Sequence, residues 1–171
     1  ILSSGLHSPK YVQCAQLMSK PNKAVKICES LAKKIKNELS DFNLILSPAM
    51  GGVIVGYELG KILNKQTIFS ERVKEEFKLR RDFEIKKGDK VLIVEDVITT
   101  GKSSLECSKL VTMSKANIAG YACIIDRSNN KSEIKGKIVS QLKLNIPTYD
   151  KDNIPEELLS IKAVKPGSRD L

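Results

Sequence analysis

Residues 91–104 read VLIVEDVITTGKSS, and this stretch decides the fold. Its four apolar residues, 91–94, predict a strand buried on both faces, like the strands of a parallel sheet. Glu95 and Asp96 follow as adjacent carboxylates, and like charges at the tip of a buried strand need a chemical reason to lie together. The Thr-, Gly- and Ser-rich loop after them opens a predicted helix near Gly101. We expect the N–H and hydroxyl groups of this loop to cradle a phosphate.

Two other interpretations of this stretch are weaker. Solvated acids at a strand end, followed by a Ser/Thr helix cap, would explain either half but not the joined run 95–104. A nucleoside-triphosphate P-loop requires a glycine five residues before Gly101, and Asp96 stands there. Two acids would also repel a triphosphate, so we reject the P-loop.

The chain on either side alternates between predicted strands and helices. We expect strands at 11–14, 44–46, 67–69, 118–125 and 138–144, the last at a sheet edge, and helices at 21–39, 53–63, 101–115 and near 154–156. The densely charged segment 71–87 predicts an exposed hairpin or a mobile loop. This order indicates an α/β fold with a mostly parallel central sheet and helices on both faces. Ligands of such folds bind at the carboxyl ends of the strands.

Composition limits the possible partners. The chain has 171 residues, which favours one domain, and no apolar run approaches the roughly 20 residues of a bilayer span. The net charge of +9 comes from many lysines and only five arginines. Arginine is the residue of bidentate nucleic-acid recognition, so we interpret the lysines as a solubility coat. We expect no nucleic-acid and no membrane partner.

The four cysteines predict a reducing compartment. They lie far apart, at 14, 28, 107 and 123, and form no C-x-x-C pair, while the single His7 cannot complete a zinc site. A domain of this size does not need disulfides, so we expect buried free thiols and a cytoplasmic protein. The first residue is Ile1 rather than Met, so we expect the native N-terminus to lie upstream.

Residues 91–104 resemble the phosphoribosyl-pyrophosphate motif of type I phosphoribosyltransferases. The resemblance implies that Glu95 and Asp96 are the catalytic acids, facing the ribose 2′- and 3′-hydroxyls, and that residues 99–103 hold the 5′-phosphate. The implied donor-binding residues here are Glu95, Asp96, Val97, Ile98, Thr99, Thr100, Gly101, Lys102 and Ser103.

Three other segments resemble the orotate phosphoribosyltransferase family in particular, and the resemblance runs from about residue 1 to residue 149. Residues 2–11 resemble its N-terminal substrate segment, and 47–52, with Ala49, Met50 and Gly51, resemble its pyrophosphate loop. Residues 124–127 resemble the strand end whose arginine meets orotate. The implied orotate ligands are Thr99, Arg127 and Tyr11; a guanidinium fork matches a carboxylate well. The simpler interpretations are a surface Arg127 paired with Asp126 and a partly buried core aromatic at Tyr11. Residues 166–169 are similar to some bacterial members.

The charged segment matches the family less closely. In the family, a mobile loop here closes over the neighbouring subunit's site and brings basic groups to the pyrophosphate. Arg72 matches the arginine at the start of that loop, and Lys74, Lys78 and Arg80 are further candidates. The better-known bacterial form has more lysines and a histidine in the loop, and a lysine where Gly51 stands. A solvated charged hairpin remains the alternative.

The resemblance implies a complete enzyme. It would transfer ribose 5-phosphate from phosphoribosyl pyrophosphate to N1 of orotate, in pyrimidine biosynthesis, with Mg²⁺ held mainly through the donor's oxygens and by no protein ligand directly. It would be one phosphoribosyltransferase domain, with a hood from residues 1–20 and the C-terminal part and a core of about 21–150, working as a homodimer with shared active sites. Two alternatives stay open: a purine phosphoribosyltransferase, and a regulatory or RNA-binding protein that kept the fold without catalysis.

Overall fold

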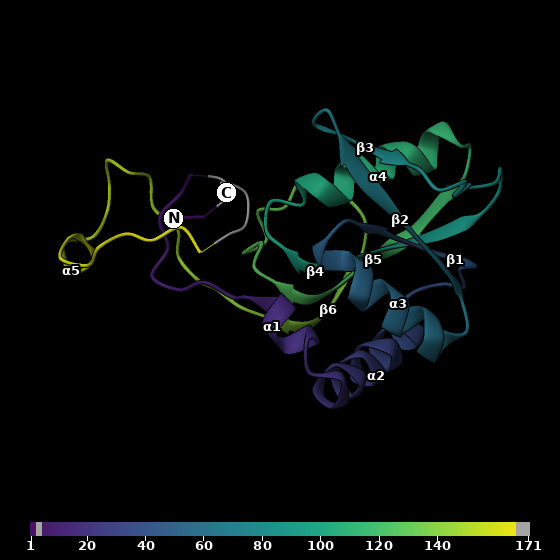
Figure 1. The fold of residues 1–171 in the computed structure, drawn as a ribbon, viewed down its shortest axis with the longest axis horizontal. Coiled ribbons are helices and arrows are strands. Elements are labelled where there is room, and N and C mark those ends of the chain that lie inside the picture. The colour runs from purple at the N-terminus through teal and green to yellow at the C-terminus, as the bar shows by residue number, and fades with distance from the viewer. Residues whose placement is uncertain (3–4, 167–171) are drawn as a thin grey trace. The chain divides into compact units, whose positions relative to one another are not determined.

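Strand β4, Lys90–Ile98, lies in the middle of a sheet of order β3-β2-β1-β4-β5-β6 in the computed structural model, which describes residues 1–2 and 5–166. Every strand pair is parallel except β2 with β3, which form an antiparallel hairpin. The expected mostly parallel sheet is thus confirmed (Figure 1). The other strands are β1 Leu44–Pro48, β2 Gln66–Val73, β3 Glu76–Leu79, β5 Asn117–Asp126 and β6 Ile138–Lys143.

Helices cover both faces of this sheet. Helix α2, Pro21–Glu38, packs on α3, Gly51–Leu63, and α3 packs on β1 and β4. Helix α4, Lys102–Met113, contacts β4 and β5 from the opposite side, as Figure 1 shows. Pro21 suits the first position of α2, where its missing N–H costs nothing. The buried stripe of α2 recurs at three- and four-residue spacing through Ala24, Cys28, Leu31, Ala32 and Ile35.

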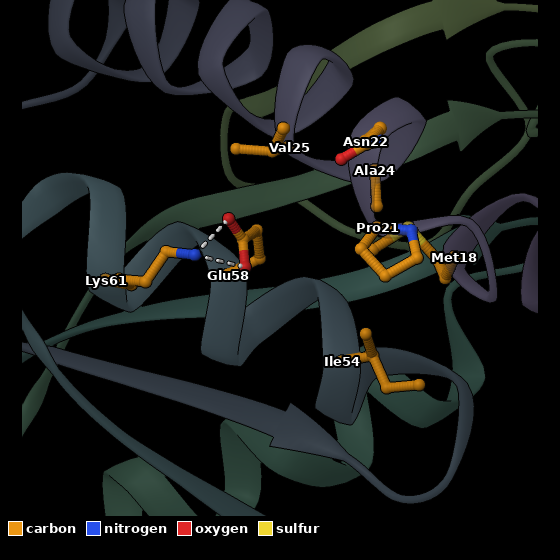
Figure 2. A pocket seen from close by; sticks show the side chains of 8 residues that line it. All are labelled: Met18, Pro21, Asn22, Ala24, Val25, Ile54, Glu58 and Lys61. Carbon is orange, nitrogen blue, oxygen red and sulfur yellow. Dashed lines mark hydrogen bonds and ion pairs between the residues drawn. The ribbon is translucent and has the colours of Figure 1, made fainter.

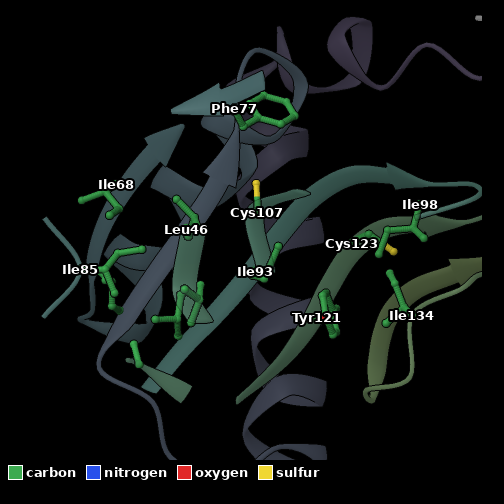
Figure 3. Close-up of a cluster of buried hydrophobic side chains, with 14 residues drawn as sticks. Leu46, Ile68, Phe77, Ile85, Ile93, Ile98, Cys107, Tyr121, Cys123 and Ile134 are labelled. Carbon is green, nitrogen blue, oxygen red and sulfur yellow. The ribbon is translucent and has the colours of Figure 1, made fainter. Parts of the chain in front are cut away.

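Strand alternation divides the core into two layers. Leu44, Leu46 and Ile93 belong to the cluster that includes Cys107 of α4 (Figure 3). Ile45, between Leu44 and Leu46, lies under α3 instead, where its Cγ2 is 3.6 Å from the position a Cβ on Gly56 would take. Continuous apolar runs in β1 and β4 are therefore needed because each strand is covered on both sides.

The strand order reverses between β1 and β4. From β1 the chain passes through α3 to β2, whereas from β4 it passes through α4 to β5 in the other direction. At such a switch point the two loops leaving the neighbouring strands diverge and leave a crevice at the carboxyl edge. Here the two connections are residues 49–50, between β1 and α3, and residues 99–101, between β4 and α4.

The ends of the chain form a unit of their own. Contacts divide the chain into a core unit, Cys14–Leu144, and a smaller unit drawn from residues 1–13 and from Asn145 onward. In the smaller unit, His7 and Tyr149 exchange two backbone hydrogen bonds of 2.9 Å. It also carries α5, Glu156–Leu159. Ser3, Ser4 and residues 167–169 of the segments singled out above lie outside the described residues, and the hood-and-core division stays a prediction.

Local differences from the sequence expectations have simple causes. The strand expected at 11–14 is wrong, because helix α1, Cys14–Met18, begins there and buries Cys14 and Met18. Helix α3 starts two residues earlier than expected, so both glycines of the turn belong to its first turn. The expectation of buried free thiols is confirmed, since all four cysteines are buried and unbridged.

Candidate functional site at the carboxyl edge of β4

The acid pair of β4 is split between the two faces of the sheet. Glu95 Oε1 accepts a 2.9 Å hydrogen bond from Ser104 Oγ of α4. Asp96 turns toward α3 instead, where a Cβ on Gly51 would come within 2.7 Å of both carboxylate oxygens. Successive side chains of a strand point to opposite faces, so two adjacent carboxylates can share one strand end with little repulsion.

Asp96 lies in a partly dehydrated place. Its Oδ1 accepts a 2.9 Å hydrogen bond from the N–H of Val97. Burial raises the pKa of Asp96 above its ordinary value, and the hydrogen bond from Val97 offsets only part of that effect. A carboxylate in this state gains from a partner that supplies hydroxyl hydrogens or positive charge.

The phosphate cradle expected after Asp96 is a braced loop. Gly101 precedes α4 with φ of +83°, a left-handed conformation that favours glycine. A Cβ there would also lie 2.7 Å from Ser132 Oγ and 2.8 Å from Ile134 Cδ1. The carbonyl of Thr100 accepts hydrogen bonds from Ser132 Oγ at 3.3 Å and from the N–H of Glu133 at 3.4 Å. The loop therefore holds its shape before the first turn of α4, whose N–H groups lack intrahelical acceptors and attract anions.

The turn 47–52 delivers a second helix N-terminus to the same edge. The N–H of Ala49 donates to the carbonyl of Ser70 at 2.8 Å, and the Ala49–Met50 peptide bond is cis. A Cβ on Gly52 would lie 2.7 Å from the carbonyl oxygen of Val94, so α3 approaches β4 closely. Met50 is 84% exposed, so its side chain does not pack in the core.

Arg127 is buried beside the end of β4. Its N–H donates to the carbonyl of Ile98 at 2.8 Å, and the residue is only 9% exposed. The neighbouring Asp126 carboxylate accepts from the N–H of Ser128 at 2.9 Å. The alternative of a surface arginine is therefore wrong. Tyr11, 43% exposed, belongs to the smaller unit.

The charged segment begins with a hairpin in which Arg72 and Lys78 lie close to carboxylates. Arg72 pairs with Glu106 of α4 at 2.7 Å, donates to the carbonyl of Glu75, and lies over the Phe77 ring at 4.2 Å. Lys78 is 3.7 Å from Glu76. The turn of the hairpin is at Lys74 and Glu75, both with positive φ. A further cluster joins Arg80 and Arg81 to Glu71 at 3.4 and 2.8 Å.

A groove elsewhere on the core unit contains none of the expected site residues. Side chains from α1, α2 and α3 line it, and Figure 2 shows the ion pair between Glu58 and Lys61 at one end. The lining residues are Met18, Pro21, Asn22, Ala24, Val25, Ile54, Glu58 and Lys61. Most of its lining side chains are apolar, so the edge of β4 is the better candidate for a phosphate site.

Comparison with known proteins agrees with this geometry. The profile of the family described as "Phosphoribosyl transferase domain" matches residues 16–160. The orotate phosphoribosyltransferase of Parvibaculum lavamentivorans is 42% identical over 170 residues, which cover 99% of this chain and 88% of that protein. The orotate phosphoribosyltransferase of Maricaulis maris is 41% identical over 172 residues, which cover 100% of this chain and 89% of that protein. The chain belongs to the orotate phosphoribosyltransferase family.

Solved structures share the fold of the family. An orotate phosphoribosyltransferase from Aeropyrum pernix aligns with a TM-score of 0.72, 21% identity, and 84% coverage of each chain. An adenine phosphoribosyltransferase from Thermoanaerobacter pseudethanolicus aligns at 0.69 with 18% identity, covering 82% of this chain and 96% of that one. Base preference thus does not follow from the fold. In the described residues, no helix is both long and apolar enough to cross a bilayer.

Two contacts that brace this candidate site were not predicted from the sequence. Ser132 and Ile134, in the loop between β5 and β6, pack against Gly101. A lone isoleucine in a polar run was the available signal. Ser104 closed the quoted motif, but its contact with Glu95 depends on the turn of α4 and could not be anticipated.

Proposed function

We propose that this protein is an orotate phosphoribosyltransferase. It transfers the ribose 5-phosphate unit of phosphoribosyl pyrophosphate to N1 of orotate, giving orotidine 5′-monophosphate and pyrophosphate, in the biosynthesis of UMP. One observation carries the proposal. This chain belongs to the family, and at its switch point the acid pair lies beside the start of α4 and the 47–52 turn. Arg127, directly after β5, lies next to the same edge, because its N–H donates to the carbonyl of Ile98.

The donor would lie across the two loops at the switch point. Residues 99–103 would hold the 5′-phosphate through backbone N–H groups, Thr and Ser hydroxyls, and the Lys102 charge. Glu95 and Asp96 would accept hydrogen bonds from the ribose hydroxyls, with Val97 and Ile98 contributing the backbone beneath them. Ala49, Met50 and Gly51 would present N–H groups to the pyrophosphate. Gly51 is exposed and has no side chain, which supports a close approach of the ligand to its backbone.

The acids would also act on the transition state. As the bond from the ribose C1 to pyrophosphate breaks, its electron pair leaves with pyrophosphate and positive charge builds on the sugar. Negative carboxylates near the ribose stabilise that charge more than they stabilise the uncharged donor sugar, which lowers the barrier. N1 of orotate needs no protein nucleophile, because its deprotonated ring attacks directly.

Arg127 would recognise the orotate carboxylate. A guanidinium offers two parallel N–H groups to a carboxylate, and dehydration strengthens the pair. Arg127 is buried and hydrogen-bonded through its main chain to Ile98, the residue directly before Thr99, and this position supports the role. Thr99 would reach the base through its hydroxyl or backbone, and Tyr11 would flank the pyrimidine.

The residues at the edge fit Mg²⁺ bound mainly by the substrate. Glu95 and Asp96 offer the oxygen donors that Mg²⁺ takes. As the family resemblance implies, these acids would hold Mg²⁺ indirectly, through the ribose hydroxyls of the donor. When bound, Mg²⁺ offsets the charge of the leaving pyrophosphate.

Three further assignments rest on the family. Arg72, Lys74 and Lys78 would contact pyrophosphate, which for Arg72 requires that it exchange Glu106 for the ligand. The active sites would be shared in a homodimer. A cytoplasmic location is supported by the four buried free thiols.

Loss of orotate absorbance on adding phosphoribosyl pyrophosphate and Mg²⁺ tests the proposal directly. Asp96→Asn should lower kcat strongly without unfolding the protein. The control is Asp41→Asn, at an acid whose side chain is 83% exposed, and it should leave kcat unchanged. Arg127→Lys should raise KM for orotate selectively. Turnover of adenine, guanine or xanthine instead of orotate would refute the base assignment. Salt-sensitive RNA binding without any turnover would favour a regulatory protein.

A further inference from the structure

A buried serine of α4 contacts the acid of β4 that faces it. Ser104 is fully buried, in the first turn of α4, and its Oγ donates to Glu95 Oε1 at 2.9 Å. A hydroxyl has one hydrogen to donate, and here a carboxylate receives it. Hydrogen bonds to charged acceptors are stronger and more directional than those between neutral groups. The contact therefore fixes the rotation of the Glu95 carboxylate.

A second buried serine of α4, Ser108, bonds the main chain of the helix and β5 instead of the acid. The main-chain carbonyl of Ser104 accepts a 2.8 Å hydrogen bond from Ser108 Oγ, one turn further along α4. Ser108 Oγ is also 2.8 Å from Tyr121 Oη of β5. Ser108 and Tyr121 are 8% and 4% exposed, so water competes little for these bonds. These bonds reach the main chain of Ser104 and not its hydroxyl, so they hold α4 against β5 without touching Glu95.

We infer that Ser104 is a positioning residue that aims the Glu95 carboxylate at the ribose hydroxyls of the donor. The inference rests on the proposed function and adds to it a residue outside the phosphate-binding run 99–103. Glu95 has two rotatable bonds beyond Cβ, and the hydrogen bond from Ser104 restricts the orientations that its carboxylate can adopt. Asp96 needs no such support, because it is shorter and accepts a hydrogen bond from the N–H of Val97.

Ser104→Ala tests the inference, with Ser108→Ala as the matched control. Both remove one buried hydroxyl from the same helix face, but only the first removes a hydrogen bond to Glu95. We expect Ser104→Ala to weaken binding of phosphoribosyl pyrophosphate, and to lower kcat/KM for it, by about tenfold, the effect of one hydrogen bond to a charged group. KM for orotate should stay unchanged. Ser108→Ala should lower the melting temperature while leaving donor affinity within about twofold.

A double-mutant cycle separates positioning from stability. In a Glu95→Gln background, Ser104→Ala should have little further effect on donor binding, because the charged partner is already gone. An equal loss of donor affinity in Ser104→Ala and Ser108→Ala would overturn the inference. So would a full effect of Ser104→Ala in the Glu95→Gln background.

Donor binding, measured by titration calorimetry without any base, is read separately from turnover. A wild-type protein that binds the donor but does not convert orotate would refute the proposed function. The comparison of Ser104→Ala with Ser108→Ala by calorimetry would still decide the role of Ser104. A wild-type protein that binds no donor would refute both.

Discussion

Replacing Gly51 by alanine should impair the enzyme without weakening the fold. A Cβ at this position would lie 2.7 Å from both carboxylate oxygens of Asp96, whereas ordinary contacts begin at 3.4 Å. The carboxylate must therefore retreat by about 0.7 Å, estimated from these two distances. Gly51 is the first residue of α3 and its φ is not positive, so alanine fits the backbone there.

The expected magnitudes differ for stability and activity. Alanine in a helix gains up to about 1 kcal/mol over glycine, and less at the first position, so the melting temperature should be unchanged or slightly higher. Misplacing a catalytic group by about 1 Å can cost about a hundredfold in rate. We therefore expect kcat/KM for phosphoribosyl pyrophosphate to fall by about tenfold or more.

The assay is orotate consumption by absorbance, alongside thermal unfolding of the same preparations. Gly52→Ala is the matched contrast, because its Cβ would lie 2.7 Å from the main-chain oxygen of Val94, which cannot move without β4. That variant should lose stability. Wild-type kcat/KM in Gly51→Ala, or a fall in its melting temperature like that of Gly52→Ala, would refute the reasoning.

Two other predictions concern charge. Because burial raises the pKa of Asp96, ionising it costs stability: this cost is absent below the unfolded pKa of about 3.9 and grows as pH rises through the folded pKa. Asp96→Asn should therefore melt at a higher temperature than the wild type at pH 7.5, and the gap should close toward pH 4; a gap independent of pH would contradict this. Glu106→Gln should free the Arg72 side chain and speed amide hydrogen exchange in residues 71–79. Glu76→Gln, which removes only the exposed 3.7 Å pair with Lys78, should leave that exchange unchanged. Equal exchange in both variants would contradict a bracing role for Glu106.

Much of the fold could be predicted because it depends on local patterns. The apolar run 91–94 predicts a strand covered on both faces, and the three- and four-residue spacing in 21–38 predicts α2. The expected strand at 11–14 failed because Cys14 and Met18 are four residues apart, which is also the spacing of one buried helix face. A segment of four residues does not distinguish the two periods.

The sequence alone determined the alternation of strands and helices, the acid pair after 91–94, and the Thr-, Gly- and Ser-rich loop that follows, since all three depend on consecutive residues. Only the tertiary structure decided which distant groups meet these residues. The reversal of strand order between β1 and β4 brings Gly51 against Asp96, and the packing of α4 brings Ser104 to Glu95. Such contacts depend on how helices pack across a sheet, which spacing along the chain does not encode. For the same reason, the sequence predicts Arg72 only as a basic group of a loop, whereas the fold pairs it with Glu106.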